Sequence, residues 1–113
     1  MSERARLAAG AVLIGAALAF VARPAPAGDA AAGRKKAAQC QTCHGIDGLA
    51  KIPEAPHIAG ESELYLKTQL MAFRSGRRTH PIMSVIASGL SDADIADLAA
   101  WYSSIRISVQ VPD

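Results

Sequence analysis

Two cysteines and a histidine, Cys40, Cys43 and His44, lie within five consecutive positions of the sequence. Thiols three positions apart in a helical turn lie on one face, spaced to add across the two vinyl groups of one porphyrin. The imidazole that follows is placed to reach the iron. This is the pattern of a c-type haem attachment segment, which supplies two covalent anchors and one axial ligand.

Other chemistries also use cysteines at this spacing. A redox dithiol of the thioredoxin type belongs to a βαβ pattern, which this sequence lacks. A structural zinc site takes four ligands, and the sequence has only two cysteines. A short disulfide in an exported protein would leave His44 without a role. We therefore expect one covalently attached haem c, with its iron, as the cofactor.

Residues 1–27 have the features of a secretory signal peptide. Arginines precede the apolar run 7–22, and small residues up to Ala27 offer a cleavage site. The run is shorter than the roughly 20 residues of a membrane-spanning helix. We expect cleavage after Ala27 and export to the periplasm. The alternative is an uncleaved anchor, because Arg23 and Pro26 are unusual so close to a cleavage site.

Residues 28–113 are short enough to form a single domain. Residues 1–27 hold three of the 12 Lys+Arg and one of the 10 Asp+Glu, so the remaining totals are nine each. Nearly balanced charge argues against nucleic acid, which demands a basic surface. A domain of this size buries little apolar area alone, so a large cofactor would supply much of its core. We expect the apo form to fold poorly.

Local patterns predict three or four helices joined by long loops, an all-α fold. Asp29 is placed to cap a first helix, and Ser91 to open a last one. Glycines and prolines make residues 45–60 an irregular loop. Pro81 disfavours helix at His80 and places Met83 in a loop. The helices are expected over 28–39, 62–75 with Gly76 as C-cap, and from Ser91 to about Ser104, while the structure of the tail, 106–113, stays open.

A haem held by His44 needs a second axial ligand. The candidates are Met71, Met83, His57 and His80. Met71 lies in the middle of a predicted helix, where methionine usually fills core space. His57 belongs to the loop expected on the His44 side. Met83 follows a segment long enough to cross the opposite face, so we favour Met83, with His80 as its main competitor.

The ordered set of segments resembles the class I c-type cytochromes, most closely the small bacterial monohaem proteins and the single-haem domains of dihaem bacterial cytochromes. The resemblance covers nearly all of residues 28–105. It rests on Gly33 and on segments 40–45, 47–48, 56–60, 65–70, 73–78, 81–83 and 90–102.

The resemblance implies the cytochrome c fold and a set of residue roles. Gly33 would let the first helix cross the last beside Leu98 and Trp101, a position where tyrosine or phenylalanine is more usual. At the haem it implies thioether bonds at Cys40 and Cys43, axial ligands His44 and Met83, and a Pro56 carbonyl that accepts a hydrogen bond from the His44 ring.

With both axial positions filled, the expected function is one-electron transfer and not catalysis. Redox partner proteins would dock transiently at an exposed haem edge. The residues that we expect near this edge are Lys51, His57, Arg77, Arg78 and His80. They are alternatively ordinary solvated side chains, and the two arginines could instead pair with a haem propionate.

Two other functions stay open. A cytochrome subunit bound permanently to a dehydrogenase would use the same cofactor, with an exposed apolar patch at Ile107, Val109 and Val111 as its contact. A haem enzyme or gas sensor would need Met83 not to bind iron. Contact with a membrane is expected only through partners or an uncleaved signal.

Overall fold

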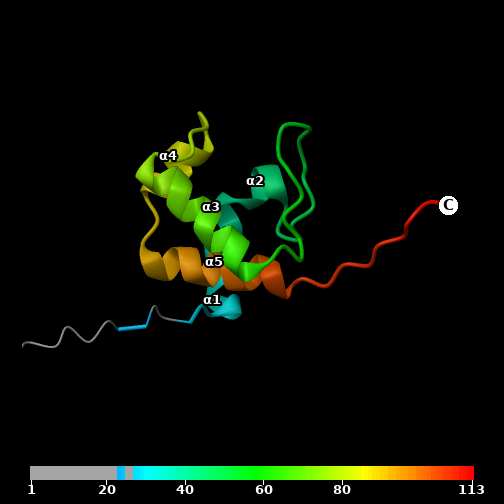
Figure 1. The fold of residues 1–113 in the computed structure, drawn as a ribbon, viewed down its shortest axis with the longest axis horizontal. Coiled ribbons are helices and arrows are strands. Elements are labelled where there is room, and N and C mark those ends of the chain that lie inside the picture. The colour runs from blue at the N-terminus through cyan, green and yellow to red at the C-terminus, as the bar shows by residue number, and fades with distance from the viewer. Residues whose placement is uncertain (1–22, 25–26) are drawn as a thin grey trace, which may run out of the picture.

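The computed structural model describes residues 23–24 and 27–113, so the predicted signal peptide, residues 1–27, lies almost entirely outside the described residues. The described residues form helices and no strands, in agreement with the all-α prediction. Figure 1 shows α5 (orange) running between α3 above it and α1 below it. In chain order the elements are α1 (Ala30–Lys36), a 3₁₀ turn (Ala37–Gln39), α2 (Gln41–His44), α3 (Glu63–Ser75), α4 (Met83–Ser88) and α5 (Asp92–Ser104).

The helix ends follow the capping residues in the sequence. The Asp29 carboxylate accepts hydrogen bonds from the backbone amides of Ala31 and Ala32, which are among the unpaired donors that begin α1. Ser91 and Asp94 form a reciprocal capping box at the start of α5. Gly76 ends α3 in the left-handed conformation, with φ of +78°, which a side chain would oppose.

Helix α1 packs directly against α5. A Cβ atom added at Gly33 would overlap the carbonyl oxygen of Asp97 and lie 2.9 Å from Cβ of Trp101. Gly28 approaches the carbonyl of Ala96 equally closely. The sequence predicted the first approach and not the second. Only glycine allows backbones to come this close, so both positions fix how the two helices cross.

Polar groups reinforce the contact between α1 and α5. The Lys36 ammonium lies 2.7 Å from Asp97 Oδ2 and 2.8 Å from Asp94 Oδ1. Asp97 Oδ1 also accepts a hydrogen bond from the Asp29 amide at 2.8 Å. These bonds hold the pKa of Asp97 below its ordinary value, the Asp29 amide contributing more than Lys36. The start of the domain is thus anchored to its last helix.

The predicted loop 45–60 is irregular, and hydrogen bonds from α5 and from the loop itself hold it in place. The Tyr102 hydroxyl donates to the carbonyl of Gly45 at 3.0 Å, and Trp101 Nε1 donates to the carbonyl of Ile46 at 3.1 Å. The Ile58 amide donates to the carbonyl of Gly48 at 2.8 Å. Burial raises the pKa of Tyr102, so its hydroxyl stays protonated and able to donate.

The prediction that Met83 lies in a loop was wrong, because Met83 is the first residue of α4. Pro81 disfavours helix only at the residue before it, whereas proline itself is well tolerated at the start of a helix. The segment after Pro81 is therefore free to become helical. Pro81 thus marks where α4 begins, and the axial candidate lies on a regular element.

Apolar residues lie at the surface in two places, at Met71 on α3 and in the C-terminal tail. Met71, which was expected in the core, is 43% exposed on α3. Beyond α5 the tail 105–113 forms no helix or strand and leads away from the helices (Figure 1). Its apolar residues Ile107, Val109 and Val111 are 57%, 76% and 84% exposed. The sequence offered no partner for them, but in the structure Ile107 packs beside Gly60, where an added Cβ would lie 3.2 Å from Ile107 Cγ1.

Candidate functional site

A cavity of about 560 Å³ lies among the helices, within the size range of small-molecule and cofactor sites. Its walls come from the 3₁₀ turn, α2, loop 45–60, α3, α4 and α5, and most of its lining surface is apolar. The apolar lining residues are Ile52, Ile58, Leu66, Leu70, Phe73, Ile82, Ile86, Leu90, Leu98 and Ala99. The cavity can therefore take a large, mainly apolar group.

The attachment segment forms part of the cavity wall. Cys40 and Cys43 are both unpaired, half-buried thiols that line the cavity together with His44. Burial, and to a lesser extent Cys43, raises the pKa of Cys40 to about 11. A redox dithiol needs the opposite shift, because the thiolate is its reactive form. The Cys40 thiol therefore lacks the lowered pKa that a redox dithiol needs.

The His44 ring is oriented by a backbone carbonyl. Its Nδ1 lies 2.9 Å from the carbonyl oxygen of Pro56, the hydrogen bond that the resemblance implied. A carbonyl can only accept, so Nδ1 carries the proton and Nε2 keeps its lone pair. His44 is buried and lines the cavity. This tautomer is the one that binds a metal through Nε2.

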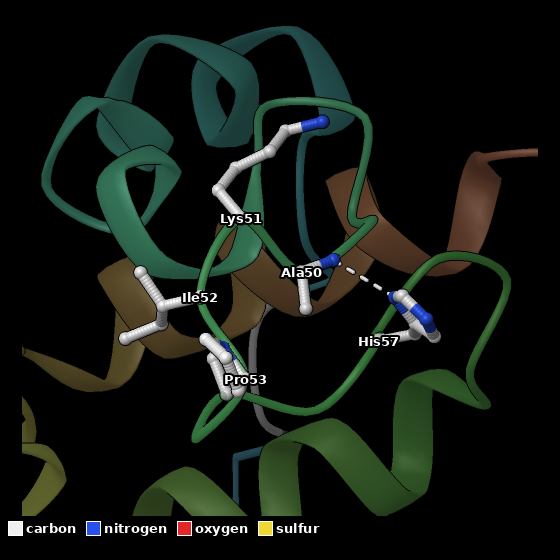
Figure 2. A pocket seen from close by; sticks show the side chains of 6 residues that line it. Ala50, Lys51, Ile52, Pro53 and His57 are labelled. Carbon is white, nitrogen blue, oxygen red and sulfur yellow. Dashed lines mark hydrogen bonds between the residues drawn. The ribbon is translucent and has the colours of Figure 1, made fainter.

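The other two histidines have the opposite tautomer. His57 Nδ1 accepts a hydrogen bond from the Ala50 amide at 2.8 Å (Figure 2). His80 Nδ1 accepts from the amides of Ile82 and Met83 at 3.2 and 3.3 Å. A neutral imidazole that accepts at Nδ1 carries its proton on Nε2 and has no second lone pair for a metal. Both rings line the cavity, but in this arrangement neither is a ligand.

Met83 lines the cavity, and Met71 does not. Met83 is half-buried at the start of α4, whereas Met71 lies on the exposed surface of α3. The two residues predicted as axial ligands, with the imidazole of His44 and the thioether of Met83, therefore line the same cavity. The structure separates the two methionines more clearly than the sequence could.

Of the five residues expected near an exposed haem edge, three line the cavity and two do not. His57, Arg78 and His80 line the cavity. Lys51 lines a shallower concavity of about 360 Å³ within loop 45–60 (Figure 2) and pairs with Asp47 at 3.0 Å. Arg77 lines neither of these cavities and donates to the Ser75 hydroxyl at 3.3 Å.

The sequence reasoning missed how Arg78 is held. Its guanidinium lies 4.5 Å from the centre of the Phe73 ring and donates to Gln69 Oε1 at 2.6 Å. Gln69 and Phe73 are four positions apart on α3 and so lie on one face. That spacing was visible in the sequence, but Gln69 was not identified as a site residue. Gln69 also lines the cavity.

Comparison with known proteins identifies relatives over most of the domain. The family model described as Cytochrome c matches residues 30–106. Cytochrome c-554(548) of Halomonas halodenitrificans is 48% identical over 81 residues, covering 69% of this chain and 98% of that protein. Cytochrome c4 of Pseudomonas aeruginosa is 46% identical over 87 residues, which are 77% of this chain but 43% of that protein. This chain therefore spans less than half of that longer relative.

A third relative, from Thiomonas intermedia, is named thiosulfate dehydrogenase electron acceptor and is 43% identical over 86 residues, covering 74% of this chain and 39% of that protein. The solved structure of reduced cytochrome c4 from Pseudomonas stutzeri matches with a TM-score of 0.68 and 40% identity, over 77% of this chain and 50% of that chain. The chain thus belongs to the cytochrome c family, with its all-α fold and its covalently attached haem c.

Proposed function

We propose that the protein is a one-electron carrier in which Cys40 and Cys43 anchor haem c and His44 and Met83 are its axial ligands. The observation that carries the proposal is that these four residues line one cavity. The tautomer of His44 adds to it, since Nε2 keeps the lone pair that a ligand needs. His80, the competing axial candidate, uses its Nδ1 lone pair on backbone amides.

The bound haem supplies an iron centre that alternates between the ferric and ferrous states. The protein residues set how readily it does so. The thioether of Met83 and the apolar walls favour the ferrous form, which raises the reduction potential. The Pro56 carbonyl fixes the orientation of the His44 ring and makes the imidazole a stronger base.

Electron transfer without catalysis follows from this ligand set. When protein side chains take both axial positions, no coordination position is left for a substrate. Partner proteins would then exchange electrons at the edge of the cavity. Arg78 and His80 are exposed and line the cavity, so they are the candidates for steering a transient partner.

A permanently bound cytochrome subunit is the second candidate function. The observation that favours it is the exposed apolar tail, with Val109 and Val111 at 76% and 84% exposure. The relative named thiosulfate dehydrogenase electron acceptor supports a dehydrogenase as the partner. Co-purification of a larger subunit from native membranes or periplasm distinguishes this function from that of a free carrier.

The periplasm is the proposed location, with residues 1–27 as a signal peptide and 28–113 as the mature domain. The support is the basic, apolar and small-residue pattern of residues 1–27. In the part of the chain that the structure describes, none of the helices combines the length and the apolar character that crossing a membrane requires. Mass spectrometry of the periplasmic protein should give an N-terminus at Gly28.

Spectroscopy of the holoprotein tests the axial ligands. The ferric wild type should show the far-red band of a thioether bound to iron, and the ferrous form should resist carbon monoxide. Met83→Ala should lose the band and bind carbon monoxide, while the matched control Met71→Ala keeps both wild-type properties. A high-spin wild type, or one that binds carbon monoxide at once, would instead support a haem enzyme or gas sensor with an open axial position.

A further inference from the structure

The His80 side chain closes the start of helix α4. Its Nδ1 accepts hydrogen bonds from the amides of Ile82 and Met83 at 3.2 and 3.3 Å. In return the Ser84 hydroxyl accepts a bond from the His80 amide at 2.9 Å. The Ser84 amide donates to the His80 carbonyl at 3.0 Å. Side chain and backbone thus bond reciprocally across the start of the helix.

This arrangement resembles a capping box in which an imidazole replaces the usual hydroxyl or carboxylate. The first amides of a helix have no partner within the helix. Ile82, the residue before α4, makes no side-chain cap of its own. Proline has no amide hydrogen, so Ile82 and Met83 carry the first two amides after His80 that can donate. Both are satisfied by the same ring nitrogen.

One of these two amides belongs to the proposed axial ligand. Met83 lines the cavity with its side chain while its own N–H is bonded to His80. The cap therefore fixes the backbone from which the thioether projects. A ligand held in this way loses less conformational freedom on binding iron than one on an uncapped loop.

We propose that His80 is a positioning residue for Met83: its Nδ1 caps α4 and holds the methionine where it binds iron. The proposal rests on the proposed function, in which Met83 is the axial ligand. It gives His80 a role that differs from iron ligation and from partner docking. The His80 ring acts through the backbone and does not touch the iron.

The test replaces His80 in the full holoprotein and measures how strongly external imidazole displaces the thioether. Imidazole is titrated into the ferric protein at neutral pH, and loss of the far-red band gives its affinity. His80→Ala should bind imidazole about fivefold more tightly, the factor expected when a helix cap of ordinary strength is lost. His80→Asn keeps a good capping acceptor and should stay within about twofold of wild type.

Two further variants and a second measurement make the result specific. Ser88→Ala removes a side-chain bond to the Val85 carbonyl within α4 and should match wild type. Ser84→Ala removes the reciprocal bond to the His80 amide and should show a smaller increase than His80→Ala, so it tests the cap if His80→Ala does not fold. Hydrogen exchange at the Ile82 and Met83 amides should be faster in His80→Ala and unchanged in His80→Asn.

The outcomes separate this proposal from the proposed function. A wild type without the far-red band overturns Met83 as the ligand, whatever the exchange rates are. A wild type with the band, together with equal imidazole affinity in His80→Ala, overturns the positioning role alone. Complete loss of the low-spin spectrum in both His80→Ala and His80→Asn would mean that His80 is an iron ligand and not a helix cap.

Discussion

The two sides of the cavity are held in different ways. On the His44 side, α5 reaches across the chain: the bonds from Tyr102 to Gly45 and from Trp101 to Ile46 span 57 and 55 positions. On the Met83 side, the bonds of His80 to Ile82 and Met83 span two and three positions. One axial candidate therefore depends on the tertiary fold, and the other on a local cap.

This difference predicts different stabilities for the two sides. Breaking the His44 side requires α5 to separate from loop 45–60, which is close to global unfolding. The Met83 side can open by uncapping α4 while α1 and α5 stay packed. Local openings of this kind have lower free energies than the global transition. Variants on the two sides should therefore be separable by measuring urea unfolding and ligand displacement together.

The largest effect is expected at Gly33. Gly33→Leu would drive a side chain into the Asp97 carbonyl and force α1 away from α5, so the free energy of unfolding should fall by about 3 kcal/mol. Urea unfolding followed by circular dichroism measures this change. Ala31→Leu adds the same bulk at an exposed position of α1 and should have little effect. Equal midpoints for the two variants would mean that the α1–α5 contact contributes little.

Tyr102→Phe should cost about 1 kcal/mol, because it removes one of the two donors to the buried carbonyl of Gly45, the other being the Gly48 amide. The loss should be global, with the far-red band disappearing at the same urea concentration as the helical signal. Tyr65→Phe, at a residue that is 48% exposed, is the control. If the band in Tyr102→Phe disappeared well before the helices unfolded, the His44 side would also be only locally held.

Arg78→Ala should weaken the binding of the thioether more than it weakens the fold, the opposite of Tyr102→Phe. Loss of the Phe73 contact and of the Gln69 bond should reduce unfolding free energy by less than about 1 kcal/mol. Imidazole should nevertheless displace the thioether more readily, because Arg78 connects α3 to the segment that leads into α4. Arg77→Ala is the matched control. A large drop in global stability for Arg78→Ala would contradict the local character of this side.

The smallest effect is expected from acid. Hydrogen bonds from Lys36 and from the Ser91 amide lower the pKa of Asp94 from 3.8 to about 2. A lowered pKa in the folded state adds stability that is present above pH 3.8 and is lost as the pH falls toward 2. Thermal unfolding between pH 5 and pH 2 should show this loss, and Asp94→Asn should flatten it. An unchanged slope in that variant would assign the acid sensitivity to other carboxylates.

Local features of the fold were predictable from the sequence. The Asp29 and Ser91 caps, the left-handed Gly76 and the irregular loop 45–60 each depend on residues within a few positions of one another. The other features of the fold depend on contacts between residues that are far apart in the chain, and local patterns do not predict these contacts. The hydrogen bond from the Tyr102 hydroxyl was not predicted, because its partner, Gly45, lies in a different segment.

The candidate site was also predictable only in part, because some of its features are local in the chain and others are not. The spacing of Cys40, Cys43 and His44 identifies one side of the cavity by itself. The sequence already favoured Met83 over His80, and the bonds to His80 Nδ1 that support this preference are visible only once the start of α4 is placed after Pro81. Gln69 was missed because the residue that it binds, Arg78, lies outside its own helix.

The packing of α1 on α5 has a consequence for the order in which the domain can form. The attachment segment precedes α5 by about 50 positions, and α1, with seven residues, is too short to be a stable helix alone. A chain that has not yet packed α5 against α1 therefore keeps the segment around Cys40 and Cys43 open. Attachment of the cofactor to this open segment can precede the final packing of the domain.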